Sequence, residues 1–283
     1  PPSCLTFFVS NFLFLYLKCY NLLMTWSLRR QIFYISLLFL FIFVFGFLII
    51  YPTFKKAPSC NDFKQNGDEV GVDCGGSCIL ACSFEASPVS VLWARSFMVV
   101  PGRYNAVAYL ENHNPNLAVD RIRYSFRFAD KDNIYLGKRE GTISIPPGRT
   151  FAVFERGVEL GSGEPVYTSF SFTDVPYWLN VKGEVVNQIQ LIPKNIVLED
   201  EDKSPHLYLD LKNESLFSIP DMNVMVILYD EHNNAINVSN TYIEEFKKEE
   251  EKRLDYTWQE GFVDRVVRKE ILPMFNVFKV QIK

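Results

Sequence analysis

Four of the six cysteines fall between positions 60 and 82, at Cys60, Cys74, Cys78 and Cys82. Thiol groups this close in a chain commonly bind a metal ion or form disulfides. Structural zinc sites usually draw their ligands from two short pairs of cysteines or histidines, whereas Cys60 has no near partner and no histidine is close. The spacing therefore favours two disulfides, with zinc as the alternative. The pairing of the four cysteines stays open.

Side chains with oxygen ligands lie between these cysteines, around Gly67: Asn61, Asp62, Asn66, Asp68, Glu69 and Asp73. Calcium takes about six to eight oxygen ligands, so calcium is a candidate cofactor of this loop. The order of the residues departs from the D-x-[DN]-x-[DN]-G of calcium loops, and the same residue types dominate ordinary turns. We expect a disulfide-linked turn without a cofactor, with calcium binding as the alternative.

The stretch also resembles a short cysteine-rich motif, C-x-D-G-x-x-N-G-x-E-x-x-V-D-C-G-G-x-C-x-x-C, found in secreted and surface-anchored proteins. Phe63 stands where glycine is usual, and one extra residue precedes Cys82. The resemblance implies an extracellular context rather than an activity. The matching residues are Cys60, Asp62, Asn66, Gly67, Glu69, Val72, Asp73, Cys74, Gly75, Gly76, Cys78 and Cys82.

The rest of the chain offers little catalytic chemistry. The three histidines, His113, His206 and His232, are far apart in sequence and lie in polar turns or at strand starts. None forms a pair with metal-ligand spacing, and no nucleophile elbow, phosphate loop or H-E-x-x-H motif occurs. We therefore expect no catalytic residue and no enzyme activity, and the residues that bind a partner stay unknown.

Aromatic residues offer a second, weaker candidate for ligand binding, as a platform for a carbohydrate or a peptide. Buried cores of β-sandwiches also require large aromatic side chains, and we expect that role here. Two N-x-S sequons, at Asn213 and Asn237, matter only where secreted proteins are glycosylated. The platform candidates are Trp93, Tyr177, Trp178, Tyr256 and Trp258.

An apolar run of 20 residues without a charge extends from Ile32 to Tyr51. As a helix it spans about 30 Å, the thickness of a bilayer core. The apolar part of a signal peptide is usually shorter, so we predict a single transmembrane helix over 32–51. Basic residues flank both ends, which leaves the positive-inside rule undecided. The predicted disulfides favour an oxidising space for everything after Tyr51, which indicates a cell-membrane protein with an extracytoplasmic C-terminal region.

Residues 1–23 contain no methionine, and Met24 opens a segment that suits the start of a membrane anchor. We interpret 1–23 as a mis-extended N-terminus, with a weak extra hydrophobic helix as the alternative. Residues 24–31 are then a short cytoplasmic segment. Residues 52–85 form a collar held by disulfides, because a segment this short cannot bury a core of its own.

After the last cysteine of the cluster, apolar residues recur with period two, the pattern of half-buried strands. In the segment RIRYSFRF, Ile122, Tyr124, Phe126 and Phe128 fall on one face and polar residues on the other. Turn-rich pieces separate this segment from several others of the same kind. Helical periodicity is scarce, apart from a predicted short helix over residues 262–269. An antiparallel all-β architecture follows.

A weak internal repeat relates the two halves of this β region. Asp130 aligns with Asp230, Asn133 with Asn233, and Asn112 with Asn213 after a slip of one residue. Such a repeat, with short strands and frequent turns, predicts two tandem β-sandwiches. We place them at 86–180 and 181–283, with the boundary between residues 174 and 186.

This layout resembles the immunoglobulin-like sandwiches of the bacterial FxLYD type and of desiccation-related LEA-type proteins. In those sandwiches an Asn-rich turn leads to a strand that ends near Asp. The resemblance implies a fold of two immunoglobulin-like β-sandwiches over residues 88–283. It implies no activity, cofactor or partner.

The formal net charge of -4 is mild, so no nucleic-acid partner is indicated. We expect a non-catalytic, membrane-anchored interaction or scaffold protein that contacts the membrane through residues 32–51. Its two sandwiches would present loops or edge strands to an unknown protein partner in the envelope or at the surface. The alternative is a calcium- or carbohydrate-dependent receptor.

Overall fold

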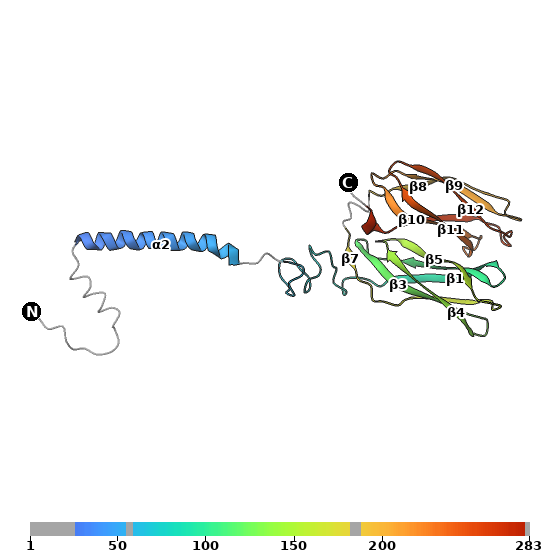
Figure 1. The fold of residues 1–283 in the computed structure, drawn as a ribbon, viewed down its shortest axis with the longest axis horizontal. Coiled ribbons are helices and arrows are strands. Elements are labelled where there is room, and N and C mark those ends of the chain that lie inside the picture. The colour runs from blue at the N-terminus through green and yellow to red at the C-terminus, as the bar shows by residue number, and fades with distance from the viewer. Residues whose placement is uncertain (1–25, 55–58, 182–187, 281–283) are drawn as a thin grey trace, which may run out of the picture. The chain divides into compact units, whose positions relative to one another are not determined.

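The computed structural model describes residues 26–54, 59–181 and 188–280 (Figure 1). The chain divides into two compact units, residues 1–58 and residues 59–283. The first unit contains helix α2 (Trp26–Phe54), and the second contains every strand that the structure describes. The predictions for residues 1–23 lie outside the described residues.

Helix α2 is long and apolar enough to cross a membrane. Its segment Trp26–Ile50 has a mean hydropathy of 2.9, and none of it is buried inside the protein. The helix begins six residues before the predicted start at Ile32, because Leu28, Arg29 and Gln31 are good helix formers that continue the same geometry. The prediction of one N-terminal apolar helix is confirmed.

The first sandwich consists of two antiparallel sheets. One sheet has the order β1-β2-β5 and the other the order β4-β3-β6, with the short strand β7 paired to the start of β3. The strands are β1 (Ser90–Val100), β2 (Arg103–Glu111), β3 (Leu117–Ala129), β4 (Tyr135–Ile145), β5 (Thr150–Glu159), β6 (Tyr167–Phe172) and β7 (Leu179–Asn180).

The second sandwich repeats this order of strands. Its first, second and fifth strands form one sheet, β12-β9-β8, and its fourth, third and sixth strands form the other, β11-β10-β13. The predicted all-β fold with two β-sandwiches is confirmed. The elements are β8 (Leu191–Glu199), β9 (His206–Asn213), β10 (Ile219–Tyr229), β11 (Ala235–Phe246), β12 (Glu251–Thr257), β13 (Arg268–Met274) and the 3-10 helix η1 (Val277–Lys279).

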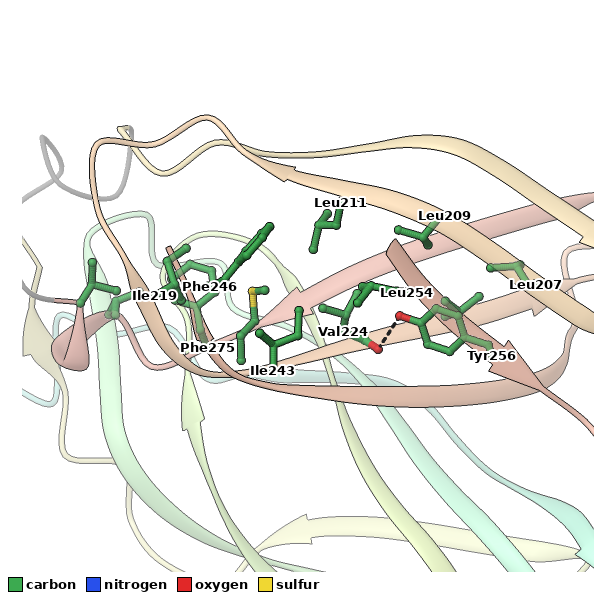
Figure 2. Packing of buried hydrophobic residues seen from close by; sticks show 14 of the residues in the cluster. Leu207, Leu209, Leu211, Ile219, Val224, Ile243, Phe246, Leu254, Tyr256 and Phe275 are labelled. Atoms are coloured by element: carbon green, nitrogen blue, oxygen red, sulfur yellow. Dashed lines mark hydrogen bonds between the residues drawn. The ribbon is translucent and has the colours of Figure 1, made fainter. Parts of the chain in front are cut away.

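Each sandwich encloses its own apolar core. In the second sandwich β9 alternates strictly, with Leu207, Leu209 and Leu211 fully buried between the sheets (Figure 2). Tyr256 of β12 is also buried, and its hydroxyl donates to the carbonyl of Val224 at 3.1 Å. This bond gives the phenol a partner that it needs away from water. In the first sandwich the apolar face of the segment RIRYSFRF points inward, as predicted.

The chain turns in the same way after β3 and after β10. The Asp130 carboxylate accepts from the backbone N–H groups two and four residues later, at 2.9 and 2.8 Å. Asp230 does the same at 2.8 and 2.7 Å. Asn133 and Asn233 both adopt positive φ, at 60° and 62°, which asparagine tolerates better than most residues. The aligned residues of the predicted repeat therefore occupy equivalent positions.

A buried asparagine occupies the same place at the ends of β2 and β9. Asn112 and Asn213 expose 1% and 0% of their surface. The Nδ2 group of each donates to backbone carbonyls of neighbouring loops, and each Oδ1 accepts a backbone N–H two residues later. These amides therefore join strand ends to loops in both sandwiches. The carbonyl acceptors are Leu117 and Pro146 for Asn112, and Phe217, Phe246 and Lys247 for Asn213.

The prediction of a short helix over residues 262–269 is wrong. The segment from Gly261 has no helical turn, and β13 begins at Arg268. Long-range contacts override the local propensity: the backbone N–H of Phe262 donates to the carbonyl of Glu201 at 2.8 Å, and that of Val266 donates to the Glu201 carboxylate at 3.3 Å.

Replacing Asn213 by alanine should destabilise the second sandwich. The substitution removes the amide group that donates to three carbonyls, two of them in buried bonds, and an unsatisfied buried group costs about 1–3 kcal/mol. Guanidinium unfolding of the full chain in detergent, followed by tryptophan fluorescence, measures the loss. His232→Ala is the control, because that side chain is exposed in a turn, and its effect should stay within about 0.5 kcal/mol. Equal effects of the two substitutions would contradict this role of Asn213.

Candidate functional site

The two sandwiches pack against each other through their sheets β1-β2-β5 and β11-β10-β13. On β10 alternate residues divide between two cores: Val224 and Val226 face their own sandwich, whereas Met225, Ile227 and Tyr229 face the other. The structure therefore has four sheet layers with an apolar layer in the middle. That middle cluster consists of Phe97, Val107, Ala152, Met225, Ile227, Tyr229, Ala235 and Val238.

A half-buried carboxylate links the sandwiches at one end of this layer. Glu270 of β13 accepts from the hydroxyl of Tyr109 at 2.7 Å and from that of Tyr229 at 2.8 Å. The Arg268 guanidinium pairs with Glu270 at 3.1 Å and lies 3.6 Å from the Tyr229 ring centroid. Burial, followed by the bond to Glu270, raises the pKa of both tyrosines. We call these four residues the Glu270 cluster.

Side chains of the first sandwich also reach backbone groups of the second. Arg95 donates to the carbonyl of Ala235 at 3.2 Å, and Arg156 donates to that of Asn240 at 2.8 Å. Because an arginine presents several donors in a rigid fork, these bonds fix the direction of approach as well as its distance. Apolar contact and oriented polar contacts together make the interface between the sandwiches specific.

A cleft of about 730 Å³ opens at the other end of the interface. The buried residues Met225, Met274 and Phe275 lie among its lining residues, and polar and apolar residues of both sandwiches complete it. We call it the inter-sandwich cleft. Its other lining residues are Asp120, Arg121, Tyr124, Thr142, Ile143, Ser144, Ala152, Val153, Phe154, Asp221, Asn223, Asn240, Asn276 and Lys279.

Polar groups of this cleft are largely paired with one another. Asp221 accepts from Lys279 at 2.8 Å and from the Tyr242 hydroxyl at 2.7 Å, and Lys279 followed by Tyr242 lowers the pKa of Asp221. The amide of Asn240 donates to Asn223 at 2.9 Å, but its own Oδ1 is buried without a partner among the described residues. A buried unpaired acceptor in a cleft is a place where a ligand or water can donate a hydrogen bond.

The predicted disulfides are present in the collar. Cys60 pairs with Cys78, and Cys74 pairs with Cys82, so the two bridges interleave along the chain. In the described part of the chain, one group of three possible metal ligands comes together, namely Cys60, Glu69 and Cys78. Two of its members are bonded to each other as a disulfide. The zinc alternative is therefore wrong.

The calcium candidates serve mainly as acceptors for the loop's own backbone. Asp73 accepts from the N–H groups of Asp62 and Phe63, both at 2.9 Å at their nearest oxygen. Asp62 in turn accepts from the N–H of Lys64 at 3.0 Å and from the Asn66 side chain at 2.9 Å. These bonds hold the backbone of the loop together.

The remaining calcium candidates lie around Asp62 and Asp73. Glu69 accepts from the N–H of Asn66 at 3.0 Å. Asp68 pairs with the Ser77 hydroxyl at 2.8 Å, which lowers its pKa, and Asn61 is exposed. The structure therefore brings Asp62, Asn66, Glu69 and Asp73 into one hydrogen-bonded loop and leaves Asp68 outside it. Calcium binding stays a prediction.

The collar is joined to the first sandwich by strand-like pairing. The N–H of Ala81 donates to the carbonyl of Trp178 at 3.0 Å, and the N–H of Asn180 donates to that of Ile79. Ala81 and Trp178 are buried in the core of the first sandwich. The segment that contains β7 therefore lies between the collar and β3, which fixes the collar to the sandwich.

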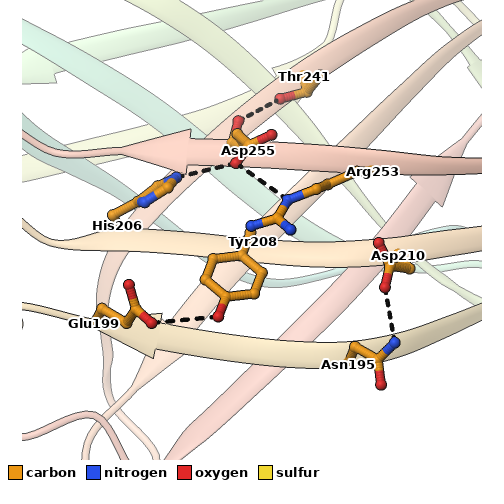
Figure 3. Close-up of polar contacts among 8 residues, drawn as sticks. All are labelled: Asn195, Glu199, His206, Tyr208, Asp210, Thr241, Arg253 and Asp255. Carbon is orange, nitrogen blue, oxygen red and sulfur yellow. Dashed lines mark hydrogen bonds and ion pairs between the residues drawn. The ribbon is translucent and has the colours of Figure 1, made fainter.

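The outer face of the sheet β12-β9-β8 carries a network of polar contacts (Figure 3). His206 lies 3.1 Å from the Asp255 carboxylate, and the Arg253 guanidinium lies 4.0 Å from the centroid of the Tyr208 ring. The Tyr208 hydroxyl donates to Glu199 at 3.2 Å. These side chains are largely exposed, and such surface ion pairs contribute little to stability. The face is a solvated outer surface.

His113 lies between Ser90 and Glu111, as the histidine of a hydrolytic triad lies between its serine and its carboxylate. Its Nε2 lies 3.1 Å from the Ser90 hydroxyl, and its Nδ1 lies 3.5 Å from the Glu111 carboxylate. Ser90 and Glu111 are register partners on β1 and β2. The trio lies at the surface, and the inter-sandwich cleft does not include it. A pair of oxyanion donors, which such chemistry also requires, is not evident around it in the described residues.

The aromatic candidates for a platform are mostly packed. Trp178 and Tyr256 are buried, and Trp258 packs on the second core. Trp93 stacks on Tyr109 at 5.4 Å, next to the interface, and Tyr177 is exposed. The expected role in a core is confirmed for Trp178 and Tyr256, whereas Trp258 and Trp93 are partly buried against the second core and the middle cluster. The sequon asparagines are also engaged: all protons of the buried Asn213 amide face carbonyls, and Asn237 accepts from the indole of Trp258 at 3.0 Å.

The comparisons with known proteins add no family. No family model matches the sequence, and no curated protein matches it. Among solved structures the chain is similar to red sea bream transglutaminase, with a TM-score of 0.21 and 8% sequence identity. The match covers 67% of this chain and 31% of the transglutaminase. A likeness at this level carries no argument about fold or function.

The contacts of the Glu270 cluster predict that removing Glu270 costs more stability than removing an exposed glutamate. Glu270→Ala leaves two half-buried hydroxyls and a guanidinium without their acceptor, so the free energy of unfolding should fall by about 1–3 kcal/mol. Glu140→Ala removes an exposed pair with Lys138 and should cost less than about 1 kcal/mol. Chemical unfolding of both variants measures the difference. A smaller loss for Glu270→Ala than for Glu140→Ala would contradict the linking role of Glu270.

The hydrogen bonds of Asp73 predict how readily a protease cleaves the collar loop. Asp73→Ala removes the acceptor of two backbone N–H groups, so limited proteolysis after Phe63 or Lys64 should become several times faster. Asp68→Ala is the control, because Asp68 lies outside this loop network and accepts from the exposed Ser77 hydroxyl. The unmodified chain should be cleaved at the same rate in calcium and in chelator. Protection by calcium that Asp73→Ala abolishes would instead support the calcium-dependent alternative.

Proposed function

We propose that this protein is a non-catalytic, membrane-anchored interaction or scaffold protein that presents its two sandwiches to an envelope or surface partner. In this proposal α2 is a single-pass anchor, and residues after it lie on the extracytoplasmic side. The length and apolar character of α2 support the anchor. The two disulfides support an oxidising compartment.

The face-to-face contact between the sandwiches is the observation that carries the proposal. Domains joined by a bare linker move independently, whereas here an apolar layer and the Glu270 cluster hold two domains in one orientation. A fixed pair of domains presents loops and edges from both at constant spacing. That property suits recognition of one extended partner surface.

Cross-linking in the cell that produces the protein tests this function. The tagged full-length chain is cross-linked, purified and analysed by mass spectrometry for its neighbours and for its disulfide-linked peptides. We expect an envelope or surface protein to be captured reproducibly, together with oxidised Cys60–Cys78 and Cys74–Cys82. Reduced cysteines with only cytosolic neighbours would invert the proposed topology and overturn the proposal.

The same experiment with two variants tests the importance of the fixed orientation. Glu270→Ala loosens the interface and should lower the yield of cross-linked partner about threefold or more, because pre-organisation contributes to affinity. Glu140→Ala leaves the interface intact and should not change the yield. Equal yields from both variants would show that the partner does not depend on the fixed pair of sandwiches.

A further inference from the structure

Three large apolar side chains of the collar are exposed and lie close together. Phe63 exposes 87% of its surface, Phe84 72% and Val72 57%. The N–H of Phe63 donates to the carboxylate of Asp73, the residue after Val72, at 2.9 Å. The Phe84 ring lies against Gly71, the residue before Val72, where an added Cβ would lie 3.7 Å from the ring. We call Phe63, Val72 and Phe84 the collar patch.

The backbone of Phe63 is also unfavourable for a phenylalanine. Its φ is 59°, in the left-handed region that glycine and asparagine adopt more readily than aromatic residues. The bonds from the N–H groups of Asp62 and Phe63 to Asp73, together with the nearby Cys60–Cys78 disulfide, hold the loop in this conformation. The collar therefore presents an aromatic ring to its surroundings from a strained, cross-linked loop. Residues held in such conformations cluster at functional positions.

The membrane is the surface that the chain itself keeps within reach of this patch. In the proposed topology α2 spans the bilayer, and only residues 55–58 separate it in the sequence from the described part of the collar, which begins at Ser59. Five residues of chain span at most about 18 Å, and the headgroup layer adds about 5–8 Å to each side of the hydrocarbon core. So short a connection gives the collar a high effective concentration at the lipid surface.

The composition of the collar favours apolar contact with lipid over attraction between charges. Lys64 is the one basic residue between positions 59 and 85, against several carboxylates. Asp62, Glu69 and Asp73 accept from backbone N–H groups of the loop, which directs these carboxylates to the loop itself. Interfacial segments commonly bury phenylalanine about 5–10 Å into the boundary between headgroups and acyl chains. The patch therefore suits a zwitterionic lipid surface.

We propose that the collar patch inserts into the headgroup region of the bilayer in which α2 is anchored. The proposal rests on the membrane anchor of the proposed function and adds a second contact with the same membrane. Lipid covers the rings of Phe63 and Phe84, which removes their apolar surface from water. Because backbone bonds join the collar to the segment of Trp178 and Asn180, a collar held on the bilayer also restrains the first sandwich.

Quenching of tryptophan fluorescence by brominated lipid tests this contact. Phe63→Trp and Phe84→Trp each add one indole to the full-length chain in phosphatidylcholine nanodiscs, and the emission of the unmodified chain is subtracted. The added emission should shift to shorter wavelength, and lipid brominated near the headgroup end of its acyl chains should quench it about twofold or more. Val263→Trp is the control, because Val263 is 100% exposed on the second sandwich, and its added emission should stay unquenched.

A substitution that relieves the strain at Phe63 separates membrane contact from the stability of the loop. In the Phe84→Trp chain, Phe63→Asn removes the ring and supplies a residue that tolerates positive φ. The loop should therefore stay folded, while the quenching of the added indole should fall about twofold. Val263→Asn in the same chain is the matched control and should leave the quenching unchanged. Equal quenching in the two chains would contradict a part for Phe63 in the contact.

The outcomes separate this inference from the proposed function. Added indoles at positions 63 and 84 that stay unquenched would overturn insertion of the collar, and a shift to shorter wavelength without quenching would show that protein, rather than lipid, covers them. A cross-linked surface partner in the cell would then still support the proposed function. Quenching of the unmodified chain reports Trp26 of α2, so its absence would overturn the membrane anchor and both proposals with it.

Discussion

Strands β2, β5 and β10 are buried on both of their faces, and the arrangement of the β region depends on this burial. Each strand contributes alternate residues to the core of its own sandwich and to the layer between the sandwiches. Apolar surface buried in this way stabilises by about 25 cal/mol per Å². The contact fixes the outer sheets and the inter-sandwich cleft relative to one another. A hinge between the sandwiches would leave none of these in a defined place.

Polar contacts fix the orientation of parts that apolar packing alone does not orient. The Glu270 cluster and the arginines that reach the second sandwich give the contact an orientation, because hydrogen bonds have direction whereas apolar contact does not. The buried amides of Asn112 and Asn213 do the same for the loops at the strand ends. In the collar, where no core is possible, two disulfides and the Asp73 carboxylate take over this role.

Several of these features follow from the sequence, and others do not. The alternation in RIRYSFRF correctly predicts a half-buried strand with a polar outer face. The run MNVMVILY on β10 is almost continuously apolar, which is the signal of a strand buried on both faces. The disulfide pairing has no local signal, because four cysteines are compatible with three pairings. The inter-sandwich cleft arises from residues more than one hundred positions apart, such as Ser144 and Lys279, and no short pattern encodes it.

The contact between the sandwiches joins two different surfaces. The first sandwich uses the sheet of its first, second and fifth strands, and the second uses that of its third, fourth and sixth. A head-to-tail contact of this kind has no built-in end, and successive copies joined in this way would grow into a fibre. Such growth would require contact between the two outer sheets, β4-β3-β6 and β12-β9-β8. Their arginines and carboxylates, among them Arg123, Arg127, Arg253 and Asp255, keep those faces hydrated, and a hydrated face disfavours such growth.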